Sequence, residues 1–159
     1  MKIYVSTYKK YNNGNLSGKW LDLEDYDSHD EFIEACNELH EDEADPELMF
    51  QDIEDIPNGM VEESSVDPML WDLLNEDNRE IIEAFMDCGY DLEYAMENWE
   101  EAYVWEWDSD GDFAKNLCEE MGDLRDIPSH ISSHIDWEGV ARDIMYDYHS
   151  SNGHYFRAL

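Results

Sequence analysis

The sequence predicts an α+β fold built from small domains. Segments rich in β-branched and aromatic residues, typical of strands, lie near both ends of the chain, whereas amphipathic helical patterns fill its middle. Turn residues at 57–59 and a change to large aromatic residues near 102 separate these regions. We therefore expect an N-terminal α+β domain, a central helical domain and a C-terminal α+β domain, over residues 1–58, 59–101 and 102–159.

The first domain is expected to contain a strand hairpin, a helix and a third strand. Residues 2–7 and 18–23 have strand composition, with turn residues between them. Ser28 is a suitable N-cap for a helix over 30–41, which gathers its apolar residues on one face and its acids on the other. Residues 48–53 then form the third strand of the predicted sheet.

The rest of the chain is expected to contain short helices and two further strands. Asp67 and Pro68 predict the start of one helix, and Gly89 predicts the end of the next. The expected helices lie over 67–74, 77–87, 91–101 and 112–121, from 128 onward, and over 137–148. The expected strands lie over 102–107 and 154–157.

The charge distribution indicates a function. Between Trp20 and Asn78 there are 22 aspartates and glutamates and no lysine or arginine, and the whole chain has a formal net charge of −33. Charges of one sign repel one another and lower the stability of the compact state. DNA carries a comparable field, with about one negative charge per 1.7 Å of helix axis. We hypothesise that the protein presents carboxylates where a DNA-binding partner expects phosphates, and that it avoids nucleic acid and anionic membranes.

Composition favours a folded protein of the cytoplasm. At 42% hydrophobic and 13% aromatic residues, the chain is too apolar for a disordered acidic tail. Its three cysteines are far apart and form no CxxC pair, which fits a reducing compartment. We expect a soluble, cytoplasmic protein, because neither a secretory signal nor a run of 18 apolar residues is present.

One segment approaches the spacing of a calcium loop. Aligned on Gly111, the residues Glu106, Asp108 and Asp110 occupy the first, third and fifth ligand positions. Leu117 stands where the loop needs a bidentate glutamate. We therefore expect a turn between a strand and a helix here, and no metal site.

Two further patterns offer residue types for chemistry without the required context. His130 and His134 are four residues apart, as in zinc-binding helices, but the segment HISSH lacks the glutamate of HExxH. Asp136 and His149 could pair with a neighbouring serine as a triad, but no GxSxG elbow positions that serine. We expect no enzyme active site and no cofactor.

Both ends of the chain resemble the ArdA antirestriction family. The final segment, 136–157, reads DWEGVARDIMYDYHSSNGHYFR and is similar to that family in its acidic-aromatic helix start, its Ala-Arg-Asp core and its turn into an aromatic strand. The opening, 3–23, is similar to the family's first hairpin. The matching hairpin residues are Tyr11, Asn12, Gly14, Gly18 and Trp20. Similar length and acidity extend the resemblance over the whole chain.

The resemblance implies a defined activity and shape. ArdA proteins are encoded on mobile genetic elements, such as conjugative plasmids, and protect incoming DNA from type I restriction-modification enzymes. They occupy the DNA-binding groove of the methyltransferase core as an elongated, curved homodimer that mimics bent B-form DNA. The resemblance therefore implies an elongated chain of three small domains in a row, with the dimer contact in the C-terminal part.

Acids at every third or fourth helical position suit a mimic of DNA phosphates. Such spacing places carboxylates about 5–6 Å apart, close to the separation of successive phosphates on one strand. We expect three rows of this kind. They comprise Glu31, Glu34, Glu38, Glu41 and Asp42; Asp72, Glu76, Glu80, Glu83 and Asp87; and Asp91, Glu93, Glu97, Glu100 and Glu101.

The dimer contact is expected where charge is sparse. After Asp112 the last 47 residues hold eight acids and four bases, so self-association there adds little repulsion. The aromatic strand just before this region supplies four apolar residues for the contact, which otherwise fill the C-terminal core. They are Tyr103, Val104, Trp105 and Trp107.

Two other interpretations of the acidic field remain open. An acidic chaperone or decoy would bind a small basic protein, such as a nucleoid protein, rather than a methyltransferase. Adaptation to high salt would explain the acids without any partner, although the aromatic content and the uneven spread of acids disfavour it. Competition with duplex DNA for a methyltransferase distinguishes the DNA mimic from both, and stoichiometric binding of small basic proteins identifies the chaperone.

Overall fold

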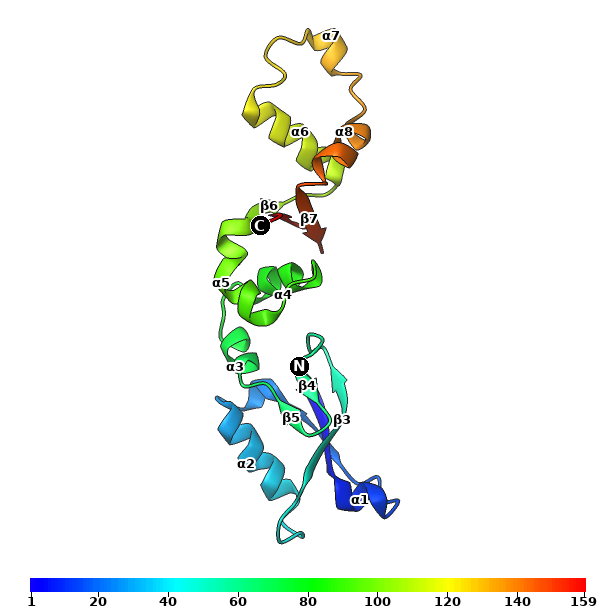
Figure 1. The fold of residues 1–159 in the computed structure, drawn as a ribbon, viewed down its shortest axis with the longest axis vertical. Helices are drawn as coiled ribbons and strands as arrows, with labels where there is room; N and C mark the ends of the chain where they lie inside the picture. The colour runs from blue at the N-terminus through cyan, green and yellow to red at the C-terminus, as the bar shows by residue number, and fades with distance from the viewer. The chain divides into compact units, whose positions relative to one another are not determined.

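The chain folds into two compact units, each with its own core. The computed structural model describes all of residues 1–159 (Figure 1). One unit comprises Met1–Arg79 and the other Glu80–Leu159. Antiparallel sheets combine with eight α-helices, so the predicted α+β class is confirmed. The division into three domains stays a prediction.

A three-stranded antiparallel sheet in the order β2-β1-β3 forms the base of the first unit. The strands are β1 (Lys2–Thr7), β2 (Lys19–Asp22) and β3 (Leu48–Glu54). Ile3 lies opposite Leu21 of β2, and both side chains are buried. The predicted hairpin and the third strand are therefore confirmed, with a bulge between Tyr4 and Val5 where β1 pairs with β3.

Phe32 is the centre of the first core. It belongs to α2 (His29–Leu39), which begins as predicted at Ser28, whose Oγ accepts a hydrogen bond from the Glu31 amide. The fully buried Phe32 ring lies 6.2 Å from Phe50 of β3 and 5.5 Å from Trp71 of α3 (Met69–Leu74). Figure 1 shows α2 beside the sheet. The predicted helix after Pro68 thus exists, and it packs in this first core.

Two short elements of the first unit differ from expectation. A turn was predicted after β1, but the chain forms α1 (Tyr8–Asn12), because the Thr7 side chain caps it by accepting from the Lys10 amide. The central domain over 59–101 was predicted to be helical, but β4 (Val61–Glu62) and β5 (Ser65–Val66) form a small hairpin at its start. A strand pair of two residues each is too short for period-two alternation to show. η1 (Leu23–Asp25) completes this unit.

A second antiparallel sheet, in the order β6-β8-β7, organises the other unit. Its strands are β6 (Tyr103–Glu106), β7 (Tyr148–Ser151) and β8 (His154–Arg157). β7 was not predicted, because a helix was expected to continue over 137–148. The Asn152-Gly153 turn explains the difference: both residues have positive φ, as a two-residue hairpin requires. β7 and β8 consequently pair, and the helix ends at Ile144.

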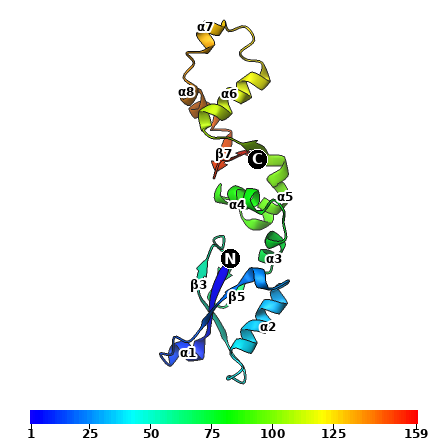
Figure 2. The same ribbon diagram turned by 180° about the vertical axis from the view of Figure 1, so that it is seen from behind.

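Helices pack on both faces of the second sheet. On one face, Phe85 stacks on Phe156 of β8 at 4.8 Å; on the other, Phe113 stacks on Tyr155 at 4.8 Å. Figures 1 and 2 show this sheet from opposite sides. The helices of this unit are α4 (Arg79–Asp87), α5 (Leu92–Ala102), α6 (Asp110–Met121), α7 (Ser129–Ser132) and α8 (Trp137–Ile144), of which α7 lies away from the sheet (Figure 1). None of the helices in this chain is long and apolar enough to cross a membrane.

Replacement of Phe32 by alanine tests the first core. We expect Phe32→Ala to lower the free energy of unfolding by about 3–5 kcal/mol, because a large aromatic side chain is lost from a packed site. Leu16→Ala is the control, since Leu16 is 70% exposed, and its effect should stay within about 0.5 kcal/mol. Denaturant unfolding, with hydrogen exchange on β1 and α2, measures both. Equal effects of the two variants would contradict this assignment of the core.

Candidate acidic binding surface

The acids of this protein lie at its surface. Among 42 aspartates and glutamates only Glu43 is buried, and its carboxylate accepts a hydrogen bond from the Thr7 hydroxyl at 2.7 Å. A buried carboxylate is costly unless it is hydrogen-bonded, which explains why this one has a partner. Nearly the whole negative charge of the chain is therefore available to an oppositely charged partner.

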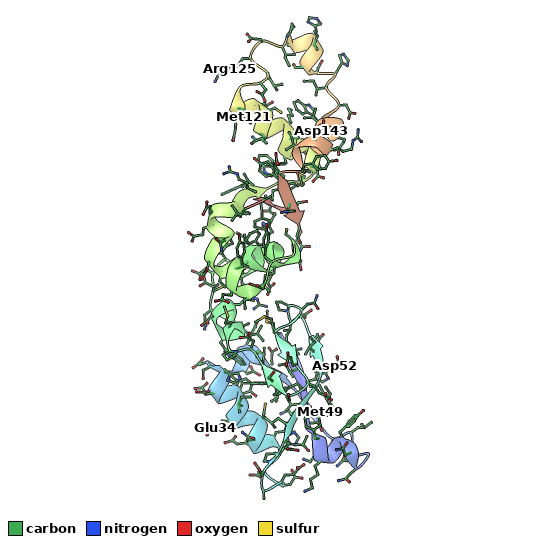
Figure 3. All side chains as sticks on the ribbon, in the orientation of Figure 1. Glu34, Met49, Asp52, Met121, Arg125 and Asp143 are labelled. Carbon is green, nitrogen blue, oxygen red and sulfur yellow. The ribbon has the colours of Figure 1, made fainter.

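The outer side of α2 carries the first expected row. Glu31, Glu34 and Glu38 are exposed, while Phe32 and Cys36 of the same helix are buried, as the 3.6-residue period requires. Glu34 is labelled in Figure 3. None of these three acids forms a salt bridge. Their charges are thus compensated by no cation of this chain.

The end of this row is different. Glu41 and Asp42 are exposed but lie beyond the helix, which ends at Leu39. Lys10 binds Asp42 at 2.8 Å and lowers the pKa of its carboxyl through this hydrogen bond. Lys10 also contacts the buried His40 at Nδ1, and burial together with the nearby ammonium group lowers the pKa of that imidazole. Asp42 is therefore already partly neutralised.

The second expected row is not a single helical row. Asp72 lies on α3 and Glu76 follows that helix, whereas the other three acids belong to α4 in the second unit. Two helices were predicted here, but the row was drawn across both, because the acids continue at helical spacing through the turn between the helices. Glu80 and Asp87 are exposed and Glu83 is half-buried.

The third row lies on α5. Its exposed residues Glu93, Glu97, Glu100 and Glu101 form no salt bridge. Asp91, also in the expected row, is the N-cap of this helix. Its carboxylate accepts a hydrogen bond from the Tyr94 amide at 2.9 Å. The face opposite the acids buries Leu92 and Ala95, as an amphipathic helix does.

Sequence reasoning missed acids on the strands. Asp52 and Glu54 of β3 are exposed, and being two residues apart they share one face of the strand. Figure 3 labels Asp52. Glu62 and Glu63, in the unpredicted hairpin, are exposed as well. The alternation of acidic and apolar residues at 52–54 could have predicted these exposed acids on a strand. The short hairpin of β4 and β5 offered no such pattern.

Of the four residues expected at a dimer contact, one is prominently exposed. Trp105 is 66% exposed and has a φ of +127°, a backbone conformation that residues other than glycine rarely adopt. Tyr103 is half-buried, with its hydroxyl 3.1 Å from His154 Nδ1, and Val104 and Trp107 are also half-buried. Three of the four thus contribute to the sheet and its surroundings.

The possible catalytic and metal patterns have structural explanations. Asp110 accepts a hydrogen bond from the Tyr155 hydroxyl at 2.6 Å, and no group of three His, Cys, Asp or Glu side chains is arranged to hold a metal ion. His130 and His134 are both exposed. Asp136 caps α8, and Ser151 donates to Asp87, so neither is paired with His149.

Salt should stabilise the free protein. Like charges along a helix destabilise it by a few tenths of a kcal/mol per pair, and added ions screen that repulsion. We therefore expect the melting temperature to rise when sodium chloride is increased from about 0.05 to 0.5 M. The triple variant Glu31→Gln/Glu34→Gln/Glu38→Gln should show a smaller rise. A melting temperature that falls with salt would contradict this account of the uncompensated rows.

The family assignment agrees with this surface. The sequence model of the family described as Antirestriction protein (ArdA) matches residues 3–157, almost the full length of the chain. A search of curated proteins finds no match. The family match covers both units, including the acidic helices of each. The chain therefore belongs to the ArdA family of antirestriction proteins, which act against restriction-modification enzymes.

Proposed function

We propose that this protein inhibits type I restriction-modification enzymes by mimicking bent B-form DNA in the DNA-binding groove of their methyltransferase core. The observation that carries the proposal is the set of seven exposed glutamates on α2 and α5 that form no salt bridge. They are Glu31, Glu34, Glu38, Glu93, Glu97, Glu100 and Glu101. A groove that binds DNA is lined with basic side chains, which these carboxylates would pair with.

The amount of charge suits a mimic of a DNA segment. At one charge per about 1.7 Å, a net charge of −33 corresponds to about 56 Å of duplex, and a homodimer doubles that length. Affinity arises from many weak contacts and from the release of ions bound to the enzyme's groove. Added salt should therefore weaken binding, although it stabilises the free protein. This mechanism needs no cofactor, and it operates in the cytoplasm, where restriction enzymes meet incoming DNA.

A variant in the α2 row tests the role of these carboxylates. Glu31→Gln/Glu34→Gln/Glu38→Gln should weaken binding to a type I methyltransferase by about tenfold, since exposed ion pairs are each worth a few tenths of a kcal/mol to 1 kcal/mol. The control is Glu119→Gln/Glu120→Gln/Asp126→Asn, which removes the same charge from exposed acids outside the three rows. Titration at fixed ionic strength measures both affinities.

The two triple variants distinguish a specific contact through α2 from a general effect of net charge. An affinity loss confined to the α2 variant supports the proposed contact. Equal losses would show that only total charge matters, and unchanged binding by the α2 variant would refute the role of this helix. If the protein ignores the methyltransferase and binds small basic nucleoid proteins stoichiometrically, the acidic chaperone function replaces the proposal.

We place the homodimer contact at β6, with Trp105 at its centre. A strained backbone costs about 1–3 kcal/mol and persists where it serves a function, and exposed tryptophans are frequent anchors of protein interfaces. Tyr103, Val104 and Trp107 would support that anchor from the same segment. β6 is also an edge strand, so its outer backbone groups are available for pairing.

A charge introduced at Trp105 tests the dimer contact. We expect Trp105→Glu to raise the dimer dissociation constant by about tenfold or more, because it removes an anchor and adds repulsion. Trp20→Glu is the control, since Trp20 is 41% exposed and lies in the first unit. Sedimentation equilibrium measures both. A dimer that tolerates Trp105→Glu as well as Trp20→Glu would move the contact elsewhere.

A further inference from the structure

A hollow in the second unit lies between α6 and α8. The helices pack closely at Gly111, where an added Cβ would collide with the Glu138 carboxylate. Farther along, apolar side chains of the two helices and of β7 surround a cavity of about 450 Å³. This α6–α8 groove has a floor made by Leu117, Cys118, Met121, Val140, Ile144 and Tyr148.

The floor of the groove is open to a partner. Met121, at the end of α6, is 69% exposed and is labelled in Figure 3. Methionine is flexible and polarizable, and it is common on surfaces that accept varied apolar side chains. Gly122 ends the helix directly after it, in a left-handed conformation with φ of +82°. Most of Met121 is therefore accessible to a partner.

The rim of the groove is acidic. Asp123, Asp143 and Asp147 line it, all three are exposed, and none forms a salt bridge. Only eight acids follow Asp112 in the sequence, and three of these eight line this one groove. None of the four bases in that part of the chain lines it. Figure 3 labels Asp143 together with Met121.

We propose that the α6–α8 groove binds a basic amphipathic helix of a protein partner. Apolar side chains of that helix would enter the floor, and its lysines or arginines would pair with the three aspartates. Leu117 to Met121 spans about one turn of α6, which matches two anchors at positions i and i+4 of a partner helix. A mimic of DNA phosphates needs no apolar floor, so this site is distinct from the carboxylate rows and does not depend on the proposed function.

The proposal is tested with a synthetic helical peptide that has leucines at positions i, i+3, i+4 and i+7 and lysines between them. The full-length protein should bind this peptide at least about tenfold more tightly than a peptide of equal charge in which glutamine replaces each leucine. Fluorescence anisotropy at about 0.15 M salt measures both affinities, because salt suppresses the general attraction of a basic peptide to an acidic protein. Equal affinities would overturn the proposal.

Matched variants locate the binding. Met121→Ser should weaken binding of the leucine peptide by about tenfold, whereas Ile131→Ser, at a residue 51% exposed on α7, should not. Asp143→Asn/Asp147→Asn should weaken it more than Glu119→Gln/Asp126→Asn, which removes equal charge outside the groove. Both apolar positions are exposed, so the variants keep the fold, as circular dichroism verifies. Equal effects of each pair, or a change of oligomeric state by Met121→Ser, would refute this occupant.

Discussion

The packing of aromatic side chains against two small sheets is the interaction on which this structure depends. A net charge of −33 opposes compactness, and the chain has only nine lysines and arginines to offset it. Phe32 in the first unit and Phe85 with Phe156 in the second are fully buried among other rings. These rings bury much apolar surface for few residues, which leaves the outer faces of α2 and α5 free to carry acids.

The separation of apolar inner faces from acidic outer faces connects the fold with the function. α2 and α5 each have one face held by the core and one face of exposed acids without a salt bridge, so the helix backbone sets the spacing of these acids before a partner arrives. A backbone that is already ordered loses little conformational freedom on binding, which favours affinity. The ArdA family match places such a surface in a protein that acts against restriction-modification enzymes. The less acidic C-terminal part, with the α6–α8 groove, and the strand β6 before it, with Trp105, carry apolar surface instead, which suits contacts with proteins.

Much of this was readable in the sequence, and the errors have physical reasons. The Ser28 cap predicted the start of α2, and the period of 3.6 assigned its buried and exposed faces correctly. The hairpin of β4 and β5 was too short to give a periodic signal. The acids from Asp72 to Asp87 kept helical spacing across a break, so one row was predicted where two helices lie. The exposure and positive φ of Trp105 depend on pairing with β8, which no local pattern reveals.

The most direct measurement is competition between this protein and DNA for one site. A labelled duplex bound to a purified type I methyltransferase is titrated with the protein, and the release of DNA is followed at several salt concentrations. The account predicts complete displacement of the duplex, with an apparent affinity that falls steeply as salt increases. Formation of a ternary complex that retains the DNA, or no effect of the folded protein on the bound duplex, would contradict it.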